Sequence, residues 1–244
     1  MSKRSNRASR RVRLVYAGLI SLFLVVAIVA ASQLIPTWLQ YRQADEEYLD
    51  LRQYGPAVPI PSQDNQLKAE LAKIAALLAI NPDYIGWLRI PGTNIDYPVV
   101  QTTDNERYLT ITFGGEENSS GTVFMDYRQT KGFNGQVAIL YGHNRRDGSM
   151  FAGLNLFHNP DYLAEHAVVT LTTLDGMTAR YKVISARNTT VDDAVFSLTT
   201  ESPEVIGKYL DQLSLPPNSR LLILATCTDA RDLVDRALVI AVRQ

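Results

Sequence analysis

Apolar residues follow helical spacing in three parts of the chain. Residues 14–31 form an uncharged, almost wholly apolar run of eighteen residues, long enough to cross a hydrocarbon core as a helix. Residues 65–80 repeat apolar side chains at the spacing of an amphipathic helix that ends before Pro82. Its expected apolar face consists of Leu67, Leu71, Ile74, Ala75 and Leu78. A second amphipathic helix is expected at residues 203–213.

Short runs rich in β-branched and aromatic residues, separated by turns, fill most of the remaining chain. Eight such runs predict strands at 84–90, 95–100, 121–127, 135–142, 167–173, 179–186, 220–227 and 237–243. Only one late helix lies between them, so they favour a closed barrel over a sheet built from βαβ units. The fold class expected is therefore mainly β: an eight-stranded β-barrel with a helix before it and a helix between the sixth and seventh strands.

The pattern divides the chain into four parts. Residues 1–13 form a basic tail, and residues 14–35 are expected to be a single transmembrane anchor. Residues 36–62 are expected to be a stalk that ends in a Pro-rich linker, because the prolines at its end are incompatible with a helix. Residues 63–244 are expected to form one folded domain that contains all eight strands.

Charge gives the expected anchor an orientation. The formal net charge of the whole chain is −1. Residues 1–13 contain six basic residues and no acidic one, whereas the rest of the chain contains 18 basic and 25 acidic residues and has a net charge of −7. The positive-inside rule keeps the tail in the cytoplasm and sends the rest outside. A cleavable signal peptide is the alternative, since the apolar run ends in small residues. An acidic body argues against nucleic-acid binding, and a basic tail beside a membrane span is a weak candidate for it.

Overall composition excludes several classes of protein. Ordinary proportions of apolar residues, glycine and proline argue against a disordered, collagen-like or low-complexity chain. The single cysteine excludes a disulfide framework and any Cys-rich zinc or iron–sulfur site.

That cysteine, Cys227, is the first candidate for chemistry. A lone cysteine is commonly a small buried hydrophobe. Cys227, however, ends the apolar run that starts at Leu221 and precedes a polar loop, so it would emerge from a buried strand at the rim of the barrel. Outside the cytoplasm an idle accessible thiol also risks oxidation. Both points favour a nucleophile.

A histidine at a strand end is the second candidate. His143 closes the run 135–142 and opens a polar loop, a position that suits either a surface residue or a catalytic base. His158 lies in a turn and His166 precedes a strand, so neither is a strong candidate. The spacing of the three histidines makes a metal site improbable.

An arginine at the start of the last strand is the third candidate. Alternation along the strands can place Arg236 beside Cys227, where a cation would lower the pKa of a thiol or stabilise an oxyanion. The alternative is an edge arginine that pairs with Asp235.

Taken together, these residues resemble the sortases, the cysteine transpeptidases of Gram-positive bacteria. The resemblance covers roughly residues 80–244 and rests on Leu224-Ala225-Thr226-Cys227, on Tyr141-Gly142-His143-Asn144 and on the arginine of the next strand. The segments 81–101, 103–109 and 121–128 and the two flanking helices are similar to class B in particular. Ile223 departs from the family motif, which begins with Thr, and Arg231 is a rival to Arg236.

The resemblance implies a sortase-type barrel outside the cell, tethered by its N-terminal helix. Cys227 would attack the carbonyl of a Thr in a C-terminal sorting motif of a secreted protein and form a thioacyl enzyme. His143 would transfer protons to and from the amines, Arg236 would hold the substrate and the oxyanion, and Thr226 would contact the substrate. The acceptor amine would come from a peptidoglycan precursor or a pilin, and no cofactor is implied.

Two alternatives remain open at this point. A membrane-tethered cysteine endopeptidase would use the same residues but transfer the acyl group to water. A non-catalytic barrel that binds cell-wall components would carry a buried, unreactive Cys227.

Overall fold

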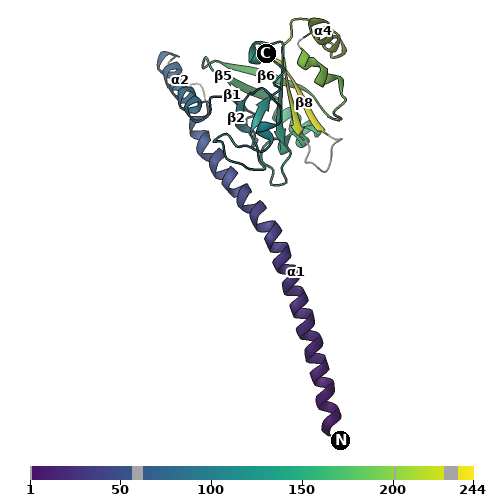
Figure 1. Ribbon diagram of the computed structural model, residues 1–244. Helices are drawn as coiled ribbons and strands as arrows, with labels where there is room; N and C mark the ends of the chain where they lie inside the picture. The colour runs from purple at the N-terminus through teal and green to yellow at the C-terminus, as the bar shows by residue number, and fades with distance from the viewer. Residues whose placement is uncertain (1, 57–62, 201, 228–235) are drawn as a thin grey trace. The chain divides into compact units, whose positions relative to one another are not determined.

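The computed structural model describes residues 2–56, 63–200, 202–227 and 236–244, in two compact units, Met1–Gln43 and Ala44–Gln244. The first unit consists of most of one long helix, α1 (Ser2–Leu51), drawn in purple in Figure 1. Within the described residues, one helix is long and apolar enough to cross a membrane, judged by length and composition. Pro36 lies inside α1, so the expected anchor and the start of the expected stalk share one continuous helix.

The second unit is a closed eight-stranded barrel, which confirms the predicted fold class. Its strands are β1 (Tyr84–Arg89), β2 (Asp96–Val100), β3 (Val123–Met125), β4 (Val137–His143), β5 (Val168–Thr173), β6 (Thr178–Thr189), β7 (Leu221–Cys227) and β8 (Arg236–Arg243). Their order around the barrel is β1-β2-β3-β4-β7-β8-β6-β5, and β5 closes it against β1. Each of these strands overlaps one of the eight expected runs, and β4, β6 and β8 extend beyond theirs.

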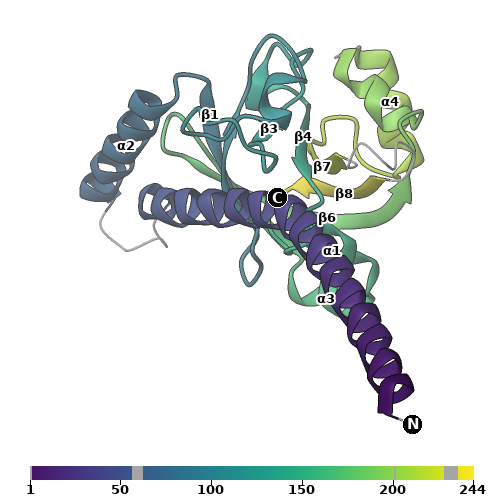
Figure 2. The ribbon, with the colours of Figure 1, turned by 60° about the horizontal axis from the view of Figure 1, so that its bottom comes forward.

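The centre of the barrel wall explains the strongest apolar runs of the sequence. Residues 137–142 of β4, 221–226 of β7 and 237–241 of β8 are all buried, as expected for strands covered on both faces. Figure 2 shows β4, β7 and β8 side by side. Strands β4 and β7 pair in parallel, so their carboxyl ends reach the same end of the barrel.

The two amphipathic helices are present, but one of them buries a different face from the expected one. Helix α4 (Pro203–Gln212), between β6 and β7, buries Ile206, Tyr209 and Leu210 on one face, as an amphipathic helix does. Helix α2 (Gln63–Ile80) buries Ile74 and Leu77. In contrast to the prediction, three of its leucines are exposed: Leu67, Leu71 and Leu78. A periodic pattern defines a stripe on a helix but not which part of the stripe the barrel covers.

Short helices occupy several connections of the barrel. Helix α3 (Pro160–Glu165) has Asn159 as its N-cap. The 3₁₀ helices are η1 (Arg52–Tyr54), η2 (Arg107–Leu109), η3 (Gly132–Asn134), η4 (Ala152–His158) and η5 (Ala194–Thr200). Of these, η2 and η5 bring residues to the candidate active site.

The last turns of α1 belong to the core of the barrel unit. Ala44, Tyr48 and Leu51 are buried, and the second unit begins at Ala44. The segment 36–62 was expected to lie outside the core as a stalk and linker. Helical spacing of these three residues in a polar stretch gave too weak a signal to separate them from the rest of that segment.

Candidate active site

His143 and Cys227 occupy matching positions at the ends of two neighbouring strands. The parallel register of β4 and β7 pairs residue 137 with residue 221 and continues without a shift to His143 and Cys227. Neighbouring strands lie about 4.8 Å apart, so the backbone brings the two predicted reactive residues together at one rim. The structure describes the strand position of Cys227, whereas its side chain lies outside the described part.

The imidazole of His143 is held by a backbone carbonyl. Its Nε2 lies 2.6 Å from the carbonyl oxygen of Leu109, and the ring is half-buried. A carbonyl oxygen only accepts hydrogen bonds, so Nε2 carries a hydrogen and donates it. In the neutral ring, Nδ1 is then the nitrogen that is able to accept a proton.

Contacts around His143 hold the strand end on which it lies. Gly142 lies against the ring of Phe151, and a Cβ at this position would come within 2.8 Å of the ring. The N–H of Phe151 donates to the carbonyl of His143 at 2.9 Å. In the same loop Arg145 and Asp147 form an ion pair at 2.8 Å. These contacts fix the backbone at the strand end that carries the imidazole.

Arg236 begins β8 beside the end of β7. The antiparallel register pairs Ala225 with Leu238. If this register is continued by two residues on each strand, Cys227 lies opposite Arg236. The Nη1 group of Arg236 donates to the carbonyl of Thr226 at 3.0 Å, and its Cζ lies 5.9 Å from the centre of the Phe196 ring. Its Nε is buried and has no hydrogen-bond partner among the described residues, which leaves it as a candidate donor to substrate.

Thr226 joins the two strands that carry Cys227 and Arg236. The residue is buried, and its hydroxyl oxygen accepts a hydrogen bond from the N–H of Ala237 at 2.9 Å. Its described atoms therefore stabilise the β7–β8 junction. A contact with substrate stays a prediction for Thr226. Arg231, the rival to Arg236, lies outside the described residues.

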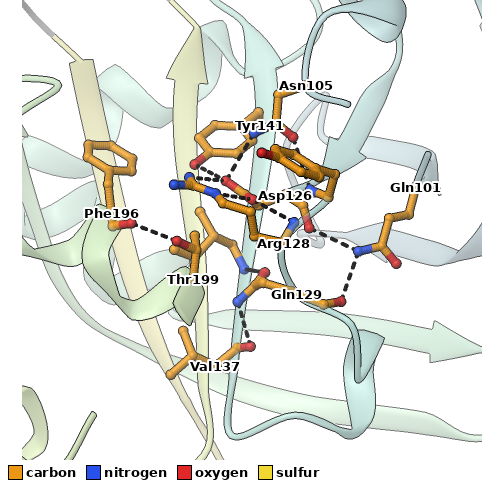
Figure 3. A network of polar contacts seen from close by, with 11 residues as sticks. Gln101, Asn105, Asp126, Arg128, Gln129, Val137, Tyr141, Phe196 and Thr199 are labelled. Atoms are coloured by element: carbon orange, nitrogen blue, oxygen red, sulfur yellow. Dashed lines mark hydrogen bonds and ion pairs between the residues drawn. The ribbon is translucent and has the colours of Figure 1, made fainter. Parts of the chain in front are cut away.

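A buried carboxylate organises the polar groups of the loops beside β3 and β4 (Figure 3). Asp126, after β3, accepts hydrogen bonds from Arg128 Nε and Nη2 at 2.9 and 2.7 Å, from the Tyr141 hydroxyl at 3.0 Å and from Asn105 Nδ2 at 3.1 Å. Burial alone raises the pKa of Asp126, but the hydrogen bonds from Arg128 and Tyr141 outweigh it, and the net pKa is lowered.

The aromatic ring of Tyr141 connects this carboxylate to Arg236. Tyr141 stacks on Phe196 with centroids 6.2 Å apart and an interplanar angle of 22°. Phe196, on η5, in turn lies under the guanidinium of Arg236. Sequence analysis did not single out Phe196, because η5 has neither strand nor helical periodicity. The Leu109 carbonyl was also missed, since a backbone acceptor has no residue-type signal.

The other two histidines lie in separate environments. His158 Nδ1 is 2.8 Å from the carbonyl of Asn155, and His166 stacks on Tyr162 with centroids 4.1 Å apart. Within the part of the chain that the structure describes, no group of three His, Cys, Asp or Glu side chains is arranged to hold a metal ion.

The chain is similar in sequence and in structure to known proteins of one family. Residues 88–244 match the family model of the sortase domain. Sortase B of Listeria monocytogenes is 34% identical over 167 residues, which cover 64% of this chain and 67% of the relative. A Staphylococcus aureus sortase B–substrate complex has a TM-score of 0.72 and 26% identity, over 84% of this chain and 98% of the other. A sortase B complexed with triglycine has a TM-score of 0.71 and 26% identity, over 83% and 98%.

Proposed function

Because the chain belongs to the sortase family, the cysteine transpeptidases of the cell wall, and is most similar to class B members, we propose that it joins secreted proteins to an amine at the cell surface. The substrate is a secreted protein with a C-terminal sorting signal. The observation that carries this proposal is the register that pairs His143 with Cys227 at the end of β4 and β7.

Cys227 is the proposed nucleophile. The thiol first gives its proton to His143. The sulfur then attacks the carbonyl carbon of a Thr in the sorting motif, and the peptide bond to the next residue breaks. The departing amine takes a proton from His143, and the acyl group stays on sulfur as a thioester. An incoming amine, deprotonated by His143, then attacks the thioester, forms a new amide and releases the thiol. Covalent catalysis of this kind divides one difficult transfer into two easier steps.

Arg236 is the proposed electrostatic partner of this reaction. One of its N–H groups is used on the Thr226 carbonyl, and its buried Nε, which has no partner among the described residues, remains available to substrate. A preorganised donor of this kind stabilises negative charge that develops on a carbonyl oxygen in the transition state. The carbonyl of Leu109 supports the same mechanism from the other side, because it orients the His143 ring.

The proposed acceptor is a primary amine of the glycine type. A sortase B related to this chain is solved with triglycine and another with a substrate, which supports a site that takes peptides with a free amino end. A peptide cross-bridge of a peptidoglycan precursor offers such an amine, whereas a pilin would offer the side-chain amine of a lysine instead.

We also propose that residues 14–35 anchor the enzyme in the cell membrane. The apolar helix of the described residues has the required length and composition. The basic residues that precede it favour a cytoplasmic N-terminus and an extracellular barrel.

Product analysis tests the proposal. The full chain in detergent micelles is incubated with a library of sorting-motif peptides, with and without triglycine, and the products are identified by mass. A peptide joined to triglycine supports a transpeptidase. Cleavage to a free acid that triglycine does not suppress would indicate an endopeptidase. An unreactive Cys227 towards a mild thiol reagent, with no cleavage, would indicate a non-catalytic barrel.

A further inference from the structure

The loop that holds His143 is itself held by the end of helix α1. Residues 107–122 include the Leu109 carbonyl that accepts from His143 Nε2. Tyr48, in the last turns of α1, donates a hydrogen bond from its buried hydroxyl to the carbonyl of Gly121 at 2.5 Å and lies 3.2 Å from the hydroxyl of Thr122. The helix end expected to be a stalk therefore contacts the loop that orients the catalytic imidazole.

Gly121 transmits this contact directly to Leu109. Its backbone has φ of 56°, and a Cβ there would lie 2.3 Å from the Tyr108 carbonyl oxygen and 2.8 Å from the Leu109 carbonyl oxygen. The N–H of Thr122 also donates to the Tyr108 carbonyl at 2.9 Å. The backbone of residues 121–122 thus packs against the acceptor of His143, so a shift of one segment displaces the other.

A second contact from the same helix end holds the far side of the loop. A carboxylate oxygen of Glu47 accepts a hydrogen bond from the N–H of Gly114 at 2.7 Å. The ring of Tyr48 also packs edge-on against Tyr97, with centroids 5.3 Å apart. Burial raises the pKa of Tyr48 above its usual value, so its hydroxyl keeps its proton and remains a donor at any working pH.

We propose that Tyr48 is a positioning residue for His143, acting through Gly121 and the carbonyl of Leu109. The inference rests on the proposed pairing of His143 with Cys227. A carbonyl fixed at hydrogen-bond distance from Nε2 stabilises the protonated imidazole, and a protonated imidazole beside a thiol stabilises the thiolate. Loosening the loop therefore reduces the reactivity of Cys227 at neutral pH.

Alkylation of Cys227 tests this without knowledge of the substrate, because the chain has one cysteine. The rate of reaction with iodoacetamide is measured across a range of pH on the full chain in detergent micelles. His143→Gln defines the profile of a thiol without its partner. Tyr48→Phe is expected to react about two- to tenfold more slowly near neutral pH, the effect of losing one hydrogen bond, and its profile is expected to move toward that of His143→Gln.

Two further variants make the result decisive. Tyr181→Phe changes another buried tyrosine, on β6, and is expected to keep the profile of the unmodified chain. Glu47→Ala removes the Gly114 contact at a half-buried position and is expected to shift the profile in the same direction as Tyr48→Phe. If Tyr48→Phe does not fold, the alkylation profile of Glu47→Ala alone decides whether the helix end acts on His143.

Three results would overturn the inference. Wild-type profiles for both Tyr48→Phe and Glu47→Ala would show that the helix end does not act on His143. An equal shift in Tyr181→Phe would show a general loosening of the barrel. An unchanged profile in His143→Gln would refute the pairing of His143 with Cys227, and the proposed mechanism would fail together with this inference.

Discussion

His143 and Cys227 are register partners in a parallel strand pair. Two strands that run in the same direction end at the same rim of a barrel, so a residue at each carboxyl end meets the other whatever the length of chain between them. The pairing of β4 with β7 therefore places a candidate base beside a candidate nucleophile. Residues 137–142 of β4 and 221–226 of β7 are all buried, so both strands are held in the barrel wall up to the residues that precede His143 and Cys227.

Replacing the nucleophile should abolish transfer without unfolding the barrel. We expect Cys227→Ala to lose all detectable joining of a sorting peptide to triglycine, since no other thiol is present in the chain. The substitution removes one small group and should change the free energy of unfolding by about 1 kcal/mol. Mass spectrometry of the products and thermal unfolding check the two parts. Joining by this variant at a comparable rate would exclude Cys227 as the nucleophile.

The barrel could be predicted from the sequence because its strands are short, apolar and separated by clear turns. The runs at β4 and β7 are nearly continuous apolar sequences, typical of strands covered on both faces. The contribution of α1 to the core could not be predicted in the same way. Tyr48 and Leu51 lie among charged residues, and only the packing of the barrel shows that they are buried.

The N-terminal boundary of the catalytic domain follows from this packing. We expect a fragment of residues 44–244 to be soluble and cooperative, whereas a fragment of residues 63–244 should be less stable by about 5 kcal/mol. That estimate assumes loss of the burial of Tyr48 and Leu51, at about 1.5–3 kcal/mol for each large apolar side chain. Denaturant unfolding of both fragments gives the difference. Equal midpoints and slopes would mean that residues 44–54 add nothing to the fold.

The close packing of Gly142 predicts a specific steric effect. In Gly142→Ala the new methyl group would meet the ring of Phe151 at 2.8 Å, and overpacking of this kind costs about 1–3 kcal/mol. Because Gly142 precedes His143, we also expect a slower transfer reaction. Gly207→Ala is the matched control: apart from its chain neighbours and the backbone of α4 itself, no atom of the described residues lies within 4 Å of its Cβ position. A gain of about 1 kcal/mol is therefore expected from helix propensity. Thermal unfolding and steady-state rates compare them, and equal behaviour of the two variants would contradict the packing argument.

The Asp126 cluster predicts how stability depends on acid. Because the pKa of folded Asp126 is lowered from the usual 3.8, the ionised carboxylate stabilises the fold fully above that value, and the contribution is lost as pH falls through the lower folded pKa. Asp126→Asn should reduce stability near neutral pH by about 1–3 kcal/mol and flatten the acid dependence below pH 3.8. Glu204→Gln, in the exposed pair with Lys208, should change little. Unfolding followed at several pH values tests both, and parallel curves for Asp126→Asn and the unmodified chain would contradict the assignment.

The candidate site could be predicted only where residue type carries the signal. Cysteine, histidine and arginine at strand ends are visible in a sequence, and the structure gathers the corresponding strand ends. The Leu109 carbonyl is a backbone group, and Phe196 reaches Arg236 only through the path of η5. Such contacts depend on the course of loops, which local patterns do not determine.

The contacts of Arg236 predict that its shape matters as well as its charge. Its guanidinium lies over Phe196, donates to the Thr226 carbonyl and keeps a buried Nε without a partner among the described residues. A lysine at this position could replace the charge but not the planar set of donors. Losing one preorganised donor to an oxyanion typically costs on the order of 100- to 1000-fold in rate, so Arg236→Lys should lose most of the rate of acylation.

Arg231→Ala is the comparison variant and should lose little of that rate, since the acidic residues beside it in the sequence favour an exposed ion pair, which contributes about 0–1 kcal/mol. Single-turnover acylation measured on both variants decides between the two arginines: the reverse ranking would assign the role to Arg231, and two unaffected rates would remove arginine from the mechanism.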